Sequence, residues 1–273
     1  MKTPITYYGG KQRLADTIVS MIPAHKIYCE PYFGGGAVFF RKPPSWLEAI
    51  NDNNDLLINF YKETQTNFEQ LKILVDASLC SESEFLRAKD IYYGRTESDP
   101  LEQAWALWYV LNLSFSGSVY GSWKKCNGTN ETHVGRYFSE KRKLFGPNLK
   151  RRLQYVQISC SDALDVIQVR DSENTFFYID PPYPSAYQQH YSGFTHRDLY
   201  ELLQLLTTIK GKFILSNYWS QTLKFHIFKY GWNYETHKMR LSVNSFHKGE
   251  TSRYRNEILV YNFEKEKDLF SNF

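Results

Sequence analysis

A carboxylate, two prolines and a tyrosine end one of the most apolar runs in the chain. The run TFFYI covers residues 175–179, and Asp180-Pro181-Pro182-Tyr183 follows it directly. Proline has no N–H and a φ near −65°, so the strand stops here and the next step of the backbone is stiff. The free carbonyl of Pro181 and the Asp180 carboxylate offer two acceptors beside the flat ring of Tyr183. This set suits an exocyclic amino group on a planar base.

The amine of adenine is a poor nucleophile because its lone pair is delocalised into the ring. Two acceptors that take both N–H hydrogens would make the nitrogen more tetrahedral and free the lone pair for attack. Such catalysis needs positioning and electrostatics, and no covalent enzyme nucleophile. The alternative is a plain strand-ending turn, since Asp-Pro opens many turns.

Two glycine motifs are candidate parts of a ligand site. The turn at 30–36, EPYFGGG, lets the backbone approach a ligand closely. Asp52, at the end of the next predicted strand, can accept hydrogen bonds from both hydroxyls of a ribose. Val38 and Phe39 stand where G-x-G-x-x-G needs its third glycine, which favours a nucleoside ligand without a pyrophosphate. In the N-terminal YYGGK, Lys11 can pair with a ligand carboxylate and Tyr7 can cover a flat or cationic group. The alternative for the first motif is a tight strand–helix turn with an exposed acid. The alternative for the second is a surface turn with a solvated lysine.

Short apolar strands alternate with helical patterns around these motifs. Helices are predicted at 12–22, 56–75, 100–113 and 196–211, and strands at 27–31, 47–52, 156–162, 175–180, 212–218 and 256–263. This alternation predicts an α/β fold whose mostly parallel sheet is covered on both faces. Residues 60–155 interrupt it and are predicted to be an inserted, mainly helical domain, within which 114–148 reads as loop or irregular hairpin. The remaining domain comprises 1–59 and 156–273.

Composition sets limits on function. The chain has 273 residues, 42% hydrophobic and 23% charged, with a net charge of +4, which fits a globular protein and permits a polyanionic partner. Its four cysteines form no C-x-x-C pair and no zinc spacing, so no metal is expected and a reducing cytoplasm is favoured. The N-terminus lacks the apolar core of a signal peptide, and no run is long enough to cross a membrane.

Taken together, the motifs resemble those of Dam-type (class α, D12 family) N6-adenine DNA methyltransferases, which use S-adenosylmethionine (SAM). They occur from end to end of the chain in the order of the family. The resemblance implies a Rossmann-like SAM-dependent methyltransferase sheet with an inserted target-recognition domain. It implies a catalytic motif at Asp180, Pro181, Pro182 and Tyr183. It implies SAM contacts from Tyr7, Lys11, Glu30, Phe33, Gly34, Gly36, Asp52, Asp162 and Asp180.

The recognition segment departs from the GATC-reading members of this family. They carry a pattern like F-N-G-x-x-R-x-N, whereas the corresponding run at 115–122 is FSGSVYGS, without the arginine and the asparagines. Specificity for GATC is therefore not carried over.

Positive charge is concentrated in residues 121–155, where nine Lys and Arg residues face two Glu, a net of about +7. We predict phosphate contacts with double-stranded DNA and flipping of the target adenine towards Tyr183. The predicted DNA-binding residues are Lys124, Lys125, Arg136, Lys141, Arg142 and Lys143. A second candidate arm, 242–257, carries Lys248, Arg253 and Arg255, although it also reads as an ordinary hairpin.

The leading prediction is transfer of a methyl group from SAM to the N6 amino group of adenine in double-stranded DNA. Three alternatives stay open at this point: an N4-cytosine methyltransferase, an RNA-adenine methyltransferase of the same fold, and a non-catalytic DNA-binding relic. A cognate restriction endonuclease is a possible partner.

Overall fold

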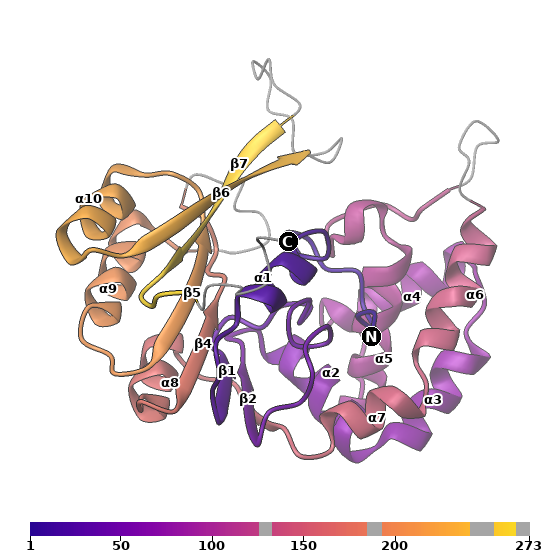
Figure 1. The fold of residues 1–273 in the computed structure, drawn as a ribbon. Helices are drawn as coiled ribbons and strands as arrows, with labels where there is room; N and C mark the ends of the chain where they lie inside the picture. Colours follow the sequence, from indigo (N-terminus) through magenta and orange to yellow (C-terminus); the bar gives the residue numbers. More distant parts are fainter. Residues whose placement is uncertain (126–132, 185–192, 241–253, 266–273) are drawn as a thin grey trace, which may run out of the picture.

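A seven-stranded sheet forms the centre of the molecule (Figure 1). The structure, a computed structural model, describes residues 1–125, 133–184, 193–240 and 254–265. The strands are β1 (Ile27–Glu30), β2 (Leu47–Asn51), β3 (Gln157–Ser159), β4 (Thr175–Ile179), β5 (Lys212–Asn217), β6 (Asn233–Arg240) and β7 (Tyr254–Tyr261). They lie in the order β3-β2-β1-β4-β5-β7-β6.

The strands from β3 to β5 are parallel. β1 pairs with β2 and β4, β2 with β3, and β4 with β5, all in parallel register. β7 runs antiparallel to both β5 and β6. The carboxyl ends of the parallel strands therefore share one edge, here called the carboxyl edge, which is where open α/β sheets bind ligands. Glu30, Asp52 and Asp180 all stand at it, as predicted.

The helices form two groups on either side of the sheet (Figure 1). They are α1 (Ala15–Met21), α2 (Asp55–Thr66), α3 (Phe68–Ala77), α4 (Glu82–Tyr92), α5 (Pro100–Leu113), α6 (Val134–Leu144), α7 (Pro147–Leu153), α8 (Ala163–Arg170), α9 (His196–Leu206) and α10 (Gln221–Tyr230), with a 3₁₀ turn, η1, at Phe115–Gly117. Side chains alternate across a strand, and β4 serves both sides. Phe176 and Tyr178 belong to a core shared with α1–α7, whereas Phe177 and Ile179 belong to one shared with α8–α10.

Two predictions of secondary structure, one of a helix and one of a loop, were wrong in detail. The pattern at 56–75 predicted one helix, but the chain forms α2 and α3, because Asn67 leaves the helical conformation at φ −118° and ψ 35°. Residues 114–148 were predicted to be a loop or an irregular hairpin, but Val134–Leu144 is helical. Val134 and Phe138 are buried one turn apart, a pairing obscured in the sequence by the Gly-, Ser- and Asn-rich stretch before it.

The glycine turn is followed by a run of turns and not by a regular helix. Residues 36–42 form consecutive turns, with hydrogen bonds from the Phe40 N–H to the Gly36 carbonyl and from the Lys42 N–H to the Val38 carbonyl. The two prolines at 43 and 44 prevent this segment from continuing as a helix.

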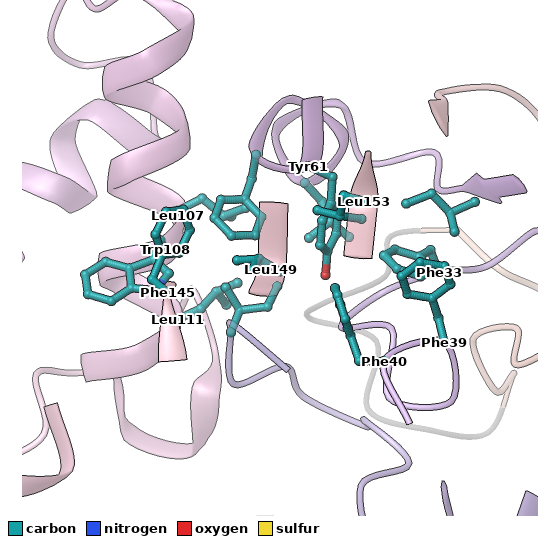
Figure 2. Packing of buried hydrophobic residues seen from close by; sticks show 14 of the residues in the cluster. Phe33, Phe39, Phe40, Tyr61, Leu107, Trp108, Leu111, Phe145, Leu149 and Leu153 are labelled. Carbon is teal, nitrogen blue, oxygen red and sulfur yellow. The ribbon is translucent and has the colours of Figure 1, made fainter. Parts of the chain in front are cut away.

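Aromatic packing joins the glycine turn to the helices of the first core (Figure 2). The rings of Phe33 and Tyr61 lie 4.8 Å apart between centroids, and those of Phe33 and Phe39 lie 5.4 Å apart. The Arg152 guanidinium from α7 lies 3.5 Å from the Phe39 ring centroid, and its Nη2 donates to Glu48 of β2 at 2.9 Å. Helices α1–α7 and one face of the sheet thus share one continuous core.

The predicted division of the chain into two domains stays a prediction. Its first boundary, between residues 59 and 60, falls inside α2, whose side chains contribute to the same core as the sheet. Within the described ranges, no helix has both the length and the apolar character that a membrane span needs.

Candidate active site

A pocket of about 570 Å³ opens at the carboxyl edge. All nine residues predicted to contact SAM line it: Tyr7, Lys11, Glu30, Phe33, Gly34, Gly36, Asp52, Asp162 and Asp180. They come from the N-terminal segment and from the ends of β1, β2, β3 and β4. The pocket is also lined by residues that were not predicted to contact SAM. These are Tyr92 of α4, Tyr120 after η1, Phe194 just before α9, and Asp198 and Glu201 within α9.

The glycine turn is shaped so that side chains larger than hydrogen do not fit. Gly36 has a φ of +63°, and a Cβ there would lie 2.4 Å from the Phe33 ring. Gly34 has a φ of +49°, and a Cβ on Gly35 would lie 2.7 Å from Cβ of Tyr7. The N-terminal segment and the turn therefore pack directly against each other, and their backbones form one wall of the pocket.

Two buried acids stand behind this wall. Asp52 accepts hydrogen bonds from the Gly34 N–H at 2.8 Å and the Asn54 N–H at 3.0 Å, which fixes its carboxylate. Burial raises the pKa of Asp52, and these backbone hydrogen bonds act in the opposite direction. The Tyr28 hydroxyl donates to Glu30, whose pKa burial raises to about 8. The pocket thus holds two carboxyl groups that are shielded from water. A cationic ligand beside them would favour their ionised form.

Asn51 ties two walls of the pocket together and was not predicted. Its Nδ2 donates to the carbonyls of Pro31 and Ser161, at 3.0 Å each. Its Oδ1 accepts from the Ser159 hydroxyl at 2.8 Å and from the Ser161 N–H at 3.0 Å. All four hydrogen-bonding positions of this buried amide are satisfied. The loops after β1 and β3 are consequently held at a fixed spacing.

Lys11 contacts Asp180, the first residue of the predicted catalytic motif, in this pocket. Its Nζ lies 2.7 Å from Oδ1 and 2.9 Å from Oδ2 of Asp180, and 3.6 Å from Oε1 of Glu257. Burial raises the pKa of Asp180, Lys11 counteracts this, and the negative charge of Glu257 adds to it. Burial lowers the pKa of Lys11, but the charges of Asp180 and Glu257 and the hydrogen bond to Asp180 together raise it above the usual value.

Glu257 is the main functional candidate that the sequence analysis did not identify. The hydroxyl of Tyr183 donates to its carboxylate, and the Ser216 hydroxyl donates to Oε1 at 2.6 Å. The Tyr183 hydroxyl also lies 3.1 Å from Oδ1 of Asp180, and its ring lies 4.4 Å from that of Tyr218, edge to face. Glu257 and Asp180 therefore both hydrogen-bond the Tyr183 hydroxyl. One ammonium faces two carboxylates here, which leaves the cluster short of positive charge.

The other motif residues have simpler surroundings. Pro181 is buried and Pro182 lines the pocket beside Asp180. Asp162 caps α8 by accepting from the Leu164 N–H at 2.8 Å. Among the residues that the structure describes, no group of three His, Cys, Asp or Glu side chains is placed to hold a metal ion.

The six predicted DNA-binding residues do not form a single cluster. Lys125 pairs with Glu82 at 3.0 Å and Lys143 with Glu140 at 2.8 Å. Arg142 donates to two backbone carbonyls, those of residues 76 and 78, at 3.1 Å each. Arg136 is exposed at the start of α6. Only Lys124 and Lys141 converge, beside the ring of Tyr137. In the second candidate arm, Lys248 and Arg253 lie outside the described residues, and Arg255 lies 5.1 Å from the Tyr218 ring centroid.

Comparison with known proteins gives a consistent result. The family model of the D12 class N6 adenine-specific DNA methyltransferases matches residues 7–264. The type II methyltransferase M1.LlaDCHI of Lactococcus lactis subsp. cremoris is 28% identical over 93% of each chain. The type II methyltransferase M.MjaIII of Methanocaldococcus jannaschii is 28% identical over 72% of this chain and 75% of its own. A DNA N-6-adenine-methyltransferase of Escherichia phage P1 is 26% identical over 92% of this chain and 34% of its own.

Proposed function

Because the chain belongs to the D12 class of N6 adenine-specific DNA methyltransferases, we propose that its pocket binds SAM and that Asp180 and Tyr183 present a flipped adenine to it. The family acts on adenine N6 in DNA, which sets aside the alternatives of cytosine N4 and of RNA. The observation that supports this assignment most directly is the meeting of Asp180, Tyr183 and the glycine turn around one pocket.

The residues at the carboxyl edge suit SAM. The sulfonium of SAM supplies an electrophilic methyl group. Asp52 stands at the end of β2 with its carboxylate fixed by the Gly34 N–H, in a position to accept ribose hydroxyls. Tyr7 covers the glycine turn, and Glu30 places a carboxyl group under the cationic part of the ligand. A Cβ at Gly36 would collide with Phe33 and narrow this floor.

Asp180 accepts an N–H of the adenine amine, and the Pro181 carbonyl accepts the other. With SAM bound, adenine N6 would attack its methyl carbon, the new N–C bond forming as the S–C bond breaks, and the Asp180 carboxylate would accept the surplus proton from N6. Burial raises the pKa of this carboxyl group, which favours its role as proton acceptor. The second carboxylate, Glu257, adds negative charge where the reacting amine becomes positive.

Lys11 must release Asp180 before the Asp180 carboxylate can accept an N–H of the adenine amine and then its surplus proton. In the present geometry its ammonium contacts both of them. The carboxylate of SAM offers Lys11 a replacement partner in the same pocket. We infer that donor binding precedes productive adenine binding, because the donor frees the catalytic carboxylate.

The experiment that tests this function measures transfer of a labelled methyl group from SAM to duplex DNA of varied sequence. Asp180→Asn keeps the shape of the side chain but replaces one acceptor by a donor, so we expect a loss of about 10²-fold or more in rate. Asp165→Asn, on the exposed face of α8, is the matched control and should retain full activity. A wild-type chain that binds SAM but transfers no methyl to any duplex would contradict the proposal.

The similarity to type II methyltransferases supports a role in a restriction–modification system. We propose a cognate restriction endonuclease as partner. Its recognition sequence would be the sequence in which genomic adenines are methylated in cells that express this chain.

A further inference from the structure

Two half-buried lysines converge on one tyrosine at the junction of α5 and α6. The Nζ of Lys124 lies 4.1 Å from the ring centroid of Tyr137, and that of Lys141 lies 5.7 Å from it. Lys124 is held in place by its N–H, which donates to the Leu113 carbonyl at 2.8 Å. The two ammonium groups therefore approach the same ring from positions set by separate elements.

These lysines have no acidic partner in the described ranges, although most basic residues around them do. Lys125 and Lys143 each pair with a glutamate. Burial lowers the pKa of Lys124. Burial lowers the pKa of Lys141 to about 8, and the charges of Lys124 and Lys2 add to this effect. Like charges gathered in a partly buried place lack a counter-ion, which a phosphate would supply.

Tyr137 connects this place with the N-terminal segment. Its hydroxyl lies 2.7 Å from the Thr6 hydroxyl. Thr6 is further fixed by Asn112 of α5, which accepts from its N–H at 3.1 Å. A Cβ on Gly117 would lie 2.7 Å from the Thr6 side chain, so the run that follows α5 also abuts Thr6. The next residue, Tyr7, packs on the glycine turn of the donor pocket.

We propose that Lys124 and Lys141 bind one phosphate of the DNA backbone, and that Thr6 couples this contact to the donor pocket. The inference rests on the proposed function for the identity of the polyanion. Its consequence is that DNA engagement and the placement of Tyr7 and Lys11 are linked through a single hydrogen bond between Thr6 and Tyr137.

The phosphate contact is tested by the salt dependence of binding to a short duplex, measured without SAM. The double variant Lys124→Met/Lys141→Met should lower the slope of log affinity against log salt by about 1, because one phosphate contact is lost. The matched control is Lys72→Met/Lys150→Met, whose lysines already pair with Asp76 and Glu69. It should leave the slope unchanged. An equal slope for both double variants would overturn the phosphate site.

The coupling is tested by removing the hydrogen bond from either side. Tyr137→Phe keeps the ring under the lysines and Thr6→Val keeps the shape of Thr6. Each should lower kcat roughly threefold to tenfold while the salt slope of DNA binding stays that of wild type. Thr6→Val also removes the hydrogen bond from the Thr6 hydroxyl to Asn112, so the double variant should lose no more than Thr6→Val alone. Additive losses, or a changed salt slope in Tyr137→Phe, would refute the coupling.

DNA binding and its salt slope can be measured without methyl transfer. A wild-type chain that binds duplexes but transfers no methyl group would refute the proposed function, and the salt slopes of the variants would still decide the phosphate site. A chain that transfers methyl groups but whose salt slope is unchanged on replacement of Lys124 and Lys141 would refute the phosphate site and keep the proposed function.

Discussion

Lys11 contacts both carboxylate oxygens of Asp180, at 2.7 and 2.9 Å. The N-terminal segment thus contacts the end of β4, and the pKa of Asp180 is lowered by a residue far from it in sequence. Glu257 lies 3.6 Å from the same ammonium, so one lysine balances two acids.

Replacement of Lys11 should shift the pH dependence of methyl transfer. The Asp180 carboxylate must be ionised to accept the amine, and Lys11 lowers the pKa of Asp180, which burial raises. In Lys11→Met the pKa of Asp180 in the free enzyme therefore rises, and the acidic limb of the kcat/KM–pH profile should move to higher pH. The exposed Lys26→Met serves as control. An unshifted profile in the variant would show that Lys11 does not set this ionisation.

Replacement of Glu257 should shift the same limb in the opposite direction. Glu257→Gln keeps an oxygen acceptor for Tyr183 and Ser216 but removes a negative charge that raises the pKa of Asp180. The acidic limb should move to lower pH, whereas kcat at its plateau should fall because the developing positive charge loses a counter-charge. Profiles that move in the same direction for both variants would rule out this account.

Burial of Glu30 should make stability fall as pH rises. Its folded-state pKa of about 8 exceeds the ordinary value of 4.5, so between these values the folded chain binds more protons at this site than the unfolded chain. The free energy of unfolding then decreases by about 1.4 kcal/mol per pH unit from this group. Glu30→Gln has no such ionisation, so urea unfolding should show its stability gaining on wild type from pH 4.5 to 8. A constant difference across this window would contradict the burial argument.

Loss of Asn51 should weaken donor binding and folding together. Asn51→Leu leaves the carbonyls of Pro31 and Ser161 and the Ser161 N–H without their partner, at a cost of about 2–5 kcal/mol in stability. Calorimetry should show SAM affinity reduced by about tenfold, since the loops after β1 and β3 lose their fixed spacing. Asn59→Leu, which removes one exposed hydrogen bond, should leave SAM affinity unchanged. Equal SAM affinity in both variants would argue against a positioning role.

Two glycines allow the steric role of the turn to be isolated. Gly36 and Gly94 have similar φ values of +63° and +65°, so alanine brings similar backbone strain to both. Only at Gly36 would the new Cβ collide, 2.4 Å from the Phe33 ring, whereas nothing lies within 4 Å at Gly94. Gly36→Ala should therefore abolish detectable SAM binding, and Gly94→Ala should retain it. Retained binding in both variants would place the donor elsewhere.

The sheet and the residues that line the pocket at its carboxyl edge could largely be predicted from sequence because their signals are local. The central strand β4 is a short apolar run, and the residue after it marks the carboxyl edge, as Asp180 does after TFFYI. The glycines at 34 and 36 indicated a turn because left-handed conformations favour glycine. Such patterns need no knowledge of which segments lie side by side.

Glu257 and Asn51 could not be predicted in the same way. Glu257 reaches the site because β7 pairs antiparallel with β5, a register that places it next to Ser216 and that no local pattern encodes. Its one sequence signal is an acid at the start of the apolar run ILVY. Asn51 reads as an ordinary polar residue at a strand end, although its amide joins two loops that are distant in the chain.

The insertion of β7 between β5 and β6 has a consequence for synthesis of the chain (Figure 1). Lys11 and Asp180 are synthesised before β7, and the Glu257 carboxylate that accepts from the Tyr183 hydroxyl is added only with β7. The residues that line the pocket all precede β7 in the chain, so the hydrogen bond between Tyr183 and Glu257 is the last of these contacts for which both partners become available.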